Sequence, residues 1–566
     1  MALVDLKAKP YYLSDEDIEW VENTIKNMTL EEKIGQLFIN LFLSFDASES
    51  KELLDKYHIG GARYLGGPSN KVHELLTGLQ KLSKIPLLVA CNCDSGGDGA
   101  MSDGTYIASA AQCEASGNEK VAYNAGYVSG REATAIGCNW NFDPCADILY
   151  NWRNTIVNTR AYGTNPDDVI KYTSAYIKGL RESNIASCAK HFPGDGVEER
   201  DQHLLLGVNN FSPEEWDKTY GKVYKKLIDD GLMTVMAGHI ALPEYQYKLN
   251  PNLKYEDILP ATLSKELITD LLRDKLGFNG LVVTDASHMI GMAAAMKRKD
   301  YVPAAIAAGC DMFLFFNDIE EDFNFMLDGY KNGIITEERL QDALRRILGL
   351  KAALNLHNKQ KEGTLVPSKE NLKVIGCEEH LNMAKEAADL GISLIKDTKN
   401  QLPIKPSTHK RIRVHTLFGD GGFEKGSENK VEKIIVEELE RVGFEVTLND
   451  GTTRVKGKVS NLENYDAALI FADVVGYAAE NNYRIRWKCP MSTDMPWYVY
   501  ELPTVFVSLN FTTHLTDVPM VKTYINAYKD TREVIRQTIQ KIMGESEFKG
   551  VNFNQHVWCN KWESRR

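Results

Sequence analysis

Residues 263–286 read LSKELITDLLRDKLGFNGLVVTDA and hold the pattern on which the fold depends. The stretch at 263–276 predicts a helix, and Gly277 and Gly280 end it before a short apolar run at 281–284. A run that is apolar throughout, rather than alternating, is typical of a parallel strand buried on both faces. A helix followed directly by such a strand predicts an α/β fold.

The same alternation continues on both sides of this stretch. Thr29 and Glu32 form a predicted capping box, and Asn165-Pro166 and Ser212-Pro213 are helix-start signals of the same kind. Eight strands that alternate with helices predict a (β/α)8 TIM-like barrel, while a doubly wound sheet remains an alternative. The eight apolar runs lie at 36–42, 59–65, 86–91, 138–143, 186–192, 232–240, 280–286 and 310–316.

A second domain follows the barrel. Residues 338–356 predict an amphipathic helix, and the polar stretch after it contains Gly and Pro, as linkers do. We therefore expect a barrel over 1–356, a linker over 357–372 and a smaller α/β (αβα sandwich) domain over 373–566. Its apolar runs lie at 392–395, 411–417, 467–471 and 503–509, with a helical stretch at 431–442.

Composition limits the class of protein. The 566 residues are 43% hydrophobic and 25% charged, with a formal net charge of −12, which argues against nucleic acid as a partner. The start of the chain does not resemble a signal peptide, and no run approaches the ~20 apolar residues of a membrane helix. The ten cysteines are scattered, as buried thiols in a reducing compartment are. We expect a cytoplasmic protein without a membrane partner, although export without a leader remains open.

Several polar side chains follow the predicted strands, where barrels carry their active sites. Asp285 ends the strand at 281–284, and this position suits a nucleophile, a metal ligand or a helix N-cap. Asp201 and His203 are two residues apart, so the carboxylate can orient the imidazole for proton transfer, or both can be solvated loop residues.

Other polar residues at strand ends are candidates for ligand binding. Lys190 and His191 lie at the end of the fifth run and can bind hydroxyl groups, or Lys190 can pair with a barrel carboxylate. Arg160 can anchor a ligand or brace its loop. Asn92 and Asp94 lie in the glycine-rich stretch ACNCDSGGDGA, which lacks the GK[ST] of a phosphate-binding loop.

A metal site is a further alternative. His191, His203, His239 and Asp285 can in principle converge on one ion, but the chain contains no HExxH and no His-x-His after the first strand. The Cys91-x-Cys93 pair has no matching second pair. We therefore expect no metal and no cofactor.

Motifs along nearly the whole chain resemble glycoside hydrolase family 3, in its β-N-acetylglucosaminidase branch. KHFPGDG followed by DQH is similar to the KHFPG…D-[ST]-H signature of that branch, and LVVTDA resembles the strand with the nucleophilic Asp. The other similar segments are TLEEKIGQLF at 29–38, NTRAYGTNPDDV at 158–169, ADLGISLIKDTKNQLPI at 388–404 and DVPMVKTYINAY at 517–528.

This resemblance implies a retaining exo-β-N-acetylglucosaminidase that takes small soluble glycosides, such as chitooligosaccharides or muropeptide fragments. Asp285 would be the nucleophile, His203 the general acid/base and Asp201 its orienting partner. The residues implied to bind the sugar are Arg160, Lys190, His191, Asn92, Asp94 and His239.

The chain departs from the family pattern at three positions. Asp195 stands where the family usually has His, Gln202 stands between Asp201 and His203 in place of Ser or Thr, and Asn92 replaces an expected acidic residue. The sugar preference therefore stays open between N-acetylglucosaminides and glucosides. Phosphate as the acceptor, and a sugar-binding protein without catalysis, are the remaining alternatives.

Overall fold

The computed structural model describes residues 3–419, 428–449, 459–475, 478, 484–487 and 495–551. The chain forms two compact units. The first comprises Met1–Tyr106, Ala122–Asn151 and Asn165–Leu381, and the second comprises Ile107–Val121, Trp152–Thr164 and Asn382–Arg566.

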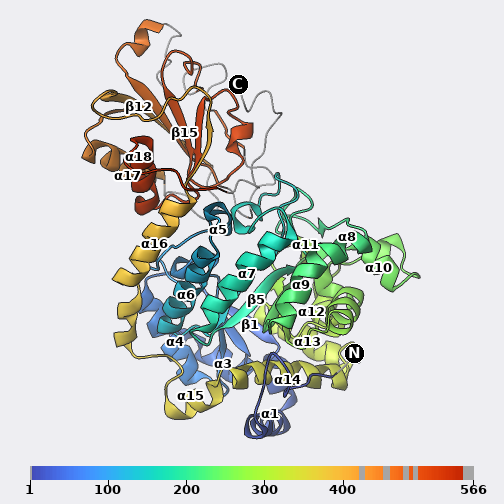
Figure 1. Ribbon diagram of the computed structural model, residues 1–566. Coiled ribbons are helices and arrows are strands. Elements are labelled where there is room, and N and C mark those ends of the chain that lie inside the picture. The colour runs from blue at the N-terminus through green and yellow to red at the C-terminus, as the bar shows by residue number, and fades with distance from the viewer. Residues whose placement is uncertain are drawn as a thin grey trace. The chain divides into compact units, whose positions relative to one another are not determined.

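Eight parallel strands close into a barrel in the first unit, in the order β1-β10-β9-β7-β5-β4-β3-β2. Figure 1 shows β1 and β5 with helices such as α4 (Ser69–Leu82), α6 (Glu119–Ile136) and α7 (Pro166–Arg181) around them. Every expected apolar run contains one of these strands, so the predicted (β/α)8 barrel is confirmed and the doubly wound sheet is excluded. The strands are β1 (Phe38–Phe42), β2 (Gly61–Tyr64), β3 (Leu88–Cys91), β4 (Trp140–Asn141), β5 (Ala186–Phe192), β7 (Thr234–Ala237), β9 (Leu281–Ala286) and β10 (Met312–Leu314). A short separate pair joins β6 (Gly207–Val208) to β8 (Ile240–Ala241).

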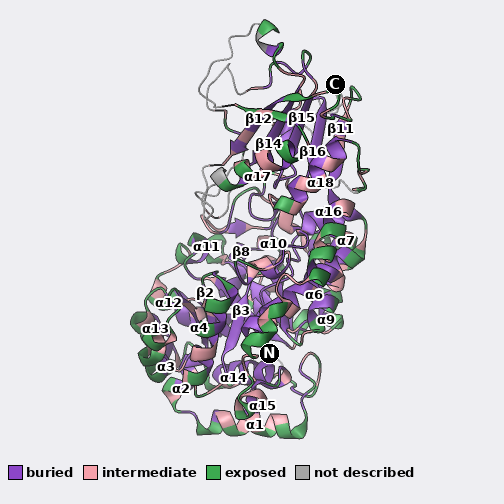
Figure 2. Cartoon of the chain, turned by 90° about the vertical axis from the view of Figure 1, so that its left-hand side faces the viewer, coloured by how far each residue is buried: buried purple, intermediate pink, exposed green. Residues whose placement is uncertain are grey.

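The barrel strands are buried on both faces because helices cover them outside and side chains fill them inside. Every residue of β3, β5 and β7 is buried. Figure 2 shows the buried strand β3 in purple. This explains why the runs are apolar throughout.

The predicted helix starts are also confirmed. Thr29 caps α2 in a reciprocal capping box with Glu32, Asn165 caps α7, and Ser212 caps α8 with Glu215. The α-helices up to residue 362 are α1 (Asp15–Asn27), α2 (Leu30–Gly35), α3 (Lys51–Tyr57), α4 (Ser69–Leu82), α5 (Ala110–Ser116), α6 (Glu119–Ile136), α7 (Pro166–Arg181), α8 (Pro213–Lys218), α9 (Tyr220–Asp229), α10 (Pro243–Leu249), α11 (Ile290–Ala293), α12 (Arg298–Ala308), α13 (Ile319–Lys331), α14 (Glu337–Ala353) and α15 (Leu356–Glu362). The helix expected at 263–276 is the π-helical segment η6 (Glu266–Lys275).

The segment expected to be a linker, 357–372, is partly helical. It contains most of α15 and the start of the 3-10 helix η7 (Lys369–Val374). The first compact unit continues to Leu381, beyond the expected end of the linker.

The second unit contains a six-stranded sheet in the order β11-β16-β15-β14-β12-β13, in which β11 alone pairs antiparallel. Four strands match the expected apolar runs, whereas β13 and β16 were not expected. The edge strand β13 is mostly exposed, so it has no apolar run to reveal it. The elements are α16 (Glu378–Gly391), β11 (Ser393–Asp397), β12 (Arg411–Phe418), α17 (Glu428–Arg441), β13 (Glu445–Leu448), β14 (Ala467–Asp473), β15 (Thr504–Ser508), β16 (Thr523–Asn526) and α18 (Arg532–Ile542).

None of the helices in the described ranges combines the length and the apolar character that a membrane crossing requires.

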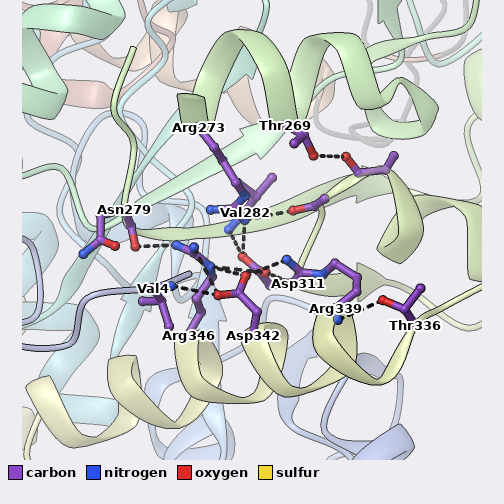
Figure 3. A network of polar contacts seen from close by, with 12 residues as sticks. Val4, Thr269, Arg273, Asn279, Val282, Asp311, Thr336, Arg339, Asp342 and Arg346 are labelled. Atoms are coloured by element: carbon purple, nitrogen blue, oxygen red, sulfur yellow. Dashed lines mark hydrogen bonds and ion pairs between the residues drawn. The ribbon is translucent and has the colours of Figure 1, made fainter. Parts of the chain in front are cut away.

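Five buried charged side chains form a network at the amino-terminal ends of the barrel strands (Figure 3). Asp311, which directly precedes β10, pairs with Arg273 at 2.7 Å and contacts Arg339. Asp342 on α14 accepts hydrogen bonds from Arg339 Nη1 at 2.7 Å and Arg346 Nε at 2.9 Å. Burial opposes the ionisation of Asp342, but the Arg346 and Arg339 guanidinium groups lower its pKa to about 2.

The same carboxylates fasten the backbone. The Val282 amide at the start of β9 donates to Asp311 Oδ2 at 2.7 Å, and the Val4 amide donates to Asp342 Oδ1 at 2.9 Å. The network therefore joins the N-terminal segment, α14 and the starts of β9 and β10 at the end of the barrel opposite the predicted catalytic residues.

Lys351, also on α14, is a buried lysine with a neutral hydrogen-bond partner. Its Nζ donates to Gln36 Oε1 at 2.7 Å, and the Gln36 amide donates to the His58 carbonyl at 2.7 Å. The side chain is fully buried, and burial lowers the pKa of Lys351 to about 7.

This pKa predicts a pH-dependent stability. An unfolded lysine holds its proton up to a pH of about 10.4, so between the two values the unfolded state binds more protons and the folded state gains stability as pH rises. The gain is at most about 1.4 kcal/mol per pH unit above pH 7. Lys351→Met should remove this gain in stability. The melting temperature of the wild type, relative to that of the variant, should therefore rise as the pH increases from 6.5 to 9. Lys331→Met, on the exposed face of α13, is the matched control. A difference that does not change with pH would contradict the prediction.

Candidate active site

The predicted site residues lie at or after the carboxyl ends of adjacent barrel strands. β9, β7, β5, β4 and β3 are consecutive in the barrel, so the residues that end them meet on one arc of its rim. β9 carries Asp285, β5 carries Lys190 and His191, His239 follows β7, and Asn92 and Asp94 follow β3.

Asp285 is a buried carboxylate surrounded by imidazoles. Its Oδ1 accepts the Ala286 amide at 2.7 Å, and its Oδ2 lies 4.0 Å from His191 Nε2. Burial works to raise the pKa of Asp285, but His191, His239 and His203 together lower it below its usual value. The group is therefore ionised at neutral pH, as a nucleophile must be.

Asp201 and His203 contact each other directly. His203 Nδ1 lies 2.6 Å from Asp201 Oδ1, which also accepts the His203 backbone amide at 2.8 Å. A carboxylate acceptor places the imidazole proton on Nδ1, which makes Nε2 the nitrogen that exchanges a catalytic proton. Asp201 is fully buried whereas the His203 side chain is 26% exposed. The buried carboxylate therefore holds an imidazole that a substrate can reach.

Gln202 holds the turn between these two residues. Its Oε1 accepts the His239 backbone amide at 2.7 Å. The Gln202 carbonyl accepts the Gly291 amide at 3.2 Å, and the His203 carbonyl accepts the Ile290 amide at 3.0 Å. The turn is thus fastened to the segment after β7 and to α11, which follows the strand of Asp285.

His191 is oriented by a buried carboxylate that sequence analysis did not single out. Its Nδ1 donates to Asp147 Oδ2 at 2.7 Å, and its backbone amide donates to Asp147 Oδ1 at 3.1 Å. Asp147 also accepts from Cys145 Sγ at 3.0 Å and from the Asp195 amide at 2.7 Å. Burial opposes the ionisation of Asp147, but His191 and these donors lower its pKa. The Nε2 side of His191 therefore faces Asp285.

Lys190 lies between two carboxylates. Its Nζ is 2.7 Å from Asp143 Oδ1 and 3.2 Å from Asp94 Oδ1, and the lysine is 1% exposed. The structure therefore brings two candidate sugar-binding residues, Lys190 and Asp94, together, and it also pairs Lys190 with a barrel carboxylate, Asp143. Asn92 Oδ1 is buried and has no hydrogen-bond partner among the described residues. Buried polar atoms are normally hydrogen-bonded, so this oxygen is a candidate acceptor for a ligand.

His239 uses both ring nitrogens within the protein. Nε2 donates to the Ala286 carbonyl at 2.9 Å, and Nδ1 accepts from Thr262 Oγ1 at 2.9 Å. Burial lowers the pKa of His239, so the ring is neutral. These contacts favour a role for His239 in positioning the backbone next to Asp285 over a role in binding the sugar.

Arg160 was expected to bind the sugar, and Asp195 stands where the family usually has His. Arg160 ends the 3-10 helix η3 (Asn158–Arg160) in the second unit, and its Nη1 donates to the Ile156 carbonyl at 3.3 Å. Its role toward a sugar remains a prediction. Asp195 is buried, and its Oδ1 accepts the Gly196 amide at 2.6 Å.

Asp143 and Asp147 are the site residues that sequence reasoning missed. Both come within six residues of β4, so their position after a barrel strand was the signal that could have revealed them. Together these groups supply an ionised carboxylate, an oriented imidazole and a buried ammonium on one rim. This set can attack an electrophilic carbon, move a proton and hold hydroxyl groups.

Comparisons with known proteins show the family of the chain. Residues 29–350 match the glycosyl hydrolase family 3 N-terminal domain. A beta-N-acetylglucosaminidase/beta-glucosidase of Cellulomonas fimi is 38% identical over 99% of this chain and 100% of its own length. The solved structure of the beta-glucoside phosphorylase BglX bound to 2FGlc is 37% identical, with a TM-score of 0.93 over 98% of each chain. A family 3 beta-N-acetylglucosaminidase from Paenibacillus, 23% identical over 94% of this chain and 99% of its own, shares the fold with a TM-score of 0.78. The chain therefore belongs to glycosyl hydrolase family 3 and is an enzyme that acts on glycosidic bonds.

Proposed function

We propose that this enzyme releases terminal β-linked N-acetylglucosamine from small glycosides by a retaining, two-step mechanism. In the first step Asp285 attacks the anomeric carbon and His203 protonates the departing oxygen, which leaves a covalent glycosyl ester on Asp285. In the second step His203 takes a proton from the acceptor, which displaces Asp285 from the sugar.

The contact of 2.6 Å between Asp201 and His203 is the observation that carries this proposal. Retaining glycosidases need one ionised carboxylate and one group that first donates and then accepts a proton. Asp285 has the first property, and the imidazole of His203 suits the second because its Nε2 can both donate and accept a proton.

A β-linked N-acetylglucosaminide or glucoside as the substrate is supported by the name of one relative and by the groups around Lys190. The Cellulomonas fimi relative is named for both N-acetylglucosaminides and glucosides. Lys190, Asp94 and the unpartnered Asn92 carbonyl oxygen supply a donor and acceptors for sugar hydroxyls.

Phosphate in place of water is the second candidate acceptor. The structurally similar BglX, 37% identical, is named as a beta-glucoside phosphorylase. An imidazole acid/base also carries no negative charge that would repel a phosphate anion, unlike a carboxylate.

The test is a set of initial rates on p-nitrophenyl β-N-acetylglucosaminide and p-nitrophenyl β-glucoside, each with and without phosphate. Faster turnover of the N-acetyl substrate supports the proposed sugar. A phosphate-dependent rise in rate together with release of a sugar 1-phosphate would assign phosphorolysis. Faster turnover of the glucoside would overturn the sugar preference and leave the catalytic assignment standing.

Asp201→Asn tests the dyad. The variant should fold normally but turn over about 10–100-fold more slowly, because the imidazole loses its orienting carboxylate and the charge that supports its cationic form. The pH dependence of kcat should change as well. A variant with the wild-type pH profile would contradict the pairing of Asp201 with His203. Asp257→Asn, an exposed position, is the matched control.

A further inference from the structure

Three side chains with the chemistry of metal ligands lie together at the start of α16, and none of them is a candidate active-site residue. Cys377 Sγ, a carboxylate oxygen of Glu379 and a ring nitrogen of His380 are within 4.8 Å of one another. We propose that Cys377, Glu379 and His380 form a binding site for a Zn²⁺ ion, with water as the fourth ligand. The proposal is independent of the catalytic assignment.

His380 has the surroundings of a metal-binding histidine. It is fully buried, and its Nδ1 donates to Glu132 Oε1 at 2.7 Å. The other nitrogen, Nε2, is buried without a hydrogen-bond partner among the described residues. Histidines that bind metals characteristically donate one ring N–H to a carboxylate, which fixes the tautomer and leaves the other nitrogen for the ion. A buried nitrogen without a partner would otherwise lower stability.

The ligand types favour zinc. A thiolate, an imidazole and a carboxylate are all groups that Zn²⁺ binds, at about 2.0–2.3 Å, whereas Ca²⁺ and Mg²⁺ prefer oxygen ligands alone. Cys377 is half-buried, and it is the only cysteine within the described ranges that is not fully buried. Glu379 is exposed, so small side-chain rotations can bring both residues onto a shared ion. Zinc binding releases the thiol proton, and affinity should therefore fall as pH falls.

Arg131 competes with the ion for Glu379. Its Nη1 donates to Glu379 Oε2 at 2.6 Å and to the Tyr127 hydroxyl at 2.9 Å. Zn²⁺ would bind next to this guanidinium, and the repulsion between the two cations would weaken the affinity. Removing the Arg131 charge should therefore strengthen zinc binding.

The site is joined to the glycine-rich loop after β3 through Glu132. The Glu132 carboxylate accepts the Thr105 amide at 2.8 Å, the Thr105 hydroxyl at 2.7 Å and the Gly376 amide at 3.1 Å. A Cβ on Gly97 would lie 1.9 Å from Glu132 Oε2, so the loop packs directly on this carboxylate. An ion on His380 would hold Glu132 and thereby stabilise this loop. The site thus has a structural role.

A second group, Cys145, Asp147 and His191, has ligand atoms equally close together. It belongs to the candidate active site, and its atoms are already bonded to one another, with Asp147 accepting from both Cys145 and His191. The experiment must separate the two groups.

The test is a titration of the full-length, chelator-treated enzyme with Co²⁺ and then Zn²⁺. Co²⁺ should produce a thiolate-to-cobalt charge-transfer absorption that saturates at a single ion per chain and disappears when Zn²⁺ is added. Zn²⁺ should also raise the melting temperature. Neither readout depends on catalysis.

Variants locate the ion. Cys377→Ser should abolish the absorption and weaken Zn²⁺ binding at least about tenfold, since it removes a ligand. Arg131→Gln should tighten binding. Glu378→Gln, at the exposed neighbouring carboxylate, and Cys145→Ser should both leave the absorption unchanged.

Cys377 is half-buried, so Cys377→Ser should not disturb the interior as a substitution of the fully buried His380 would. A loss of zinc binding in Cys377→Ser therefore reports the lost ligand and not a folding defect. The proposal is overturned if the wild type shows no saturable absorption. It is also overturned if the absorption survives in Cys377→Ser or is lost in Cys145→Ser instead.

Discussion

Asp285→Ala is expected to lower kcat/KM by about 10⁴-fold or more, because removing a covalent nucleophile removes the reaction path itself. The side chain is replaced by a methyl group at a strand end that backbone hydrogen bonds already hold. Folding should therefore be retained. The measurement is the initial rate on p-nitrophenyl β-N-acetylglucosaminide, with Asp328→Ala, an exposed position on α13, as the matched control.

A small external nucleophile gives the more specific result. Azide can enter the space left by the Asp285 carboxylate and attack the anomeric carbon from the same face. The rescued product should be the α-glycosyl azide, opposite in configuration to the β-linked substrate. Wild-type turnover in Asp285→Ala would show that the nucleophile is another residue. A third outcome is that the wild type turns over neither substrate while the Asp285→Ala variant still binds sugar. That outcome would support a sugar-binding protein without catalysis.

Asp311→Asn is expected to destabilise the barrel by about 3–5 kcal/mol, since it leaves buried Arg273 and Arg339 facing a neutral amide. The melting temperature should fall by on the order of 5–10 °C. Asp328→Asn, which changes the same charge on the exposed face of α13, should have little effect on stability.

The same variant should retain kcat and KM when assayed well below its melting temperature. Asp311 precedes β10, whereas Asp285, Lys190 and His191 lie at the carboxyl ends of their strands. A marked loss of kcat/KM at a temperature where the variant is folded would contradict the view that one end of the barrel stabilises the fold while the other end carries catalysis. Unchanged stability would contradict the energetic role of the network.

The barrel could be predicted because its strands are short and apolar and because helices between them begin with recognisable capping residues. Thr29, Asn165 and Ser212 each cap the helix that the sequence predicts. β13 escaped prediction because an exposed edge strand does not need apolar residues, so a search for buried runs passes over it. The linker expected at 357–372 contains helical segments that were not expected, because polar residues can equally cover short surface helices.

The candidate site divides in the same way. Asp285 and the Asp201–His203 pair were predictable because they lie next to a strand or next to each other in the chain. Asp147 was not, because 44 residues separate it from His191 and the barrel alone brings them together. His239 was expected at the sugar, and its bonds to Thr262 and Ala286 appear only once β7 and β9 pair.

The sequence by itself determined the alternation of strands and helices, the order of the catalytic motifs and the family, because these depend on local patterns. The tertiary structure decided which side chains are oriented, ionised or buried in pairs. Hydrogen bonds such as those of Asp147 to His191 and Asp311 to Arg273 join residues that are far apart in the chain. Their effect depends on distance and burial, which only the closed barrel sets.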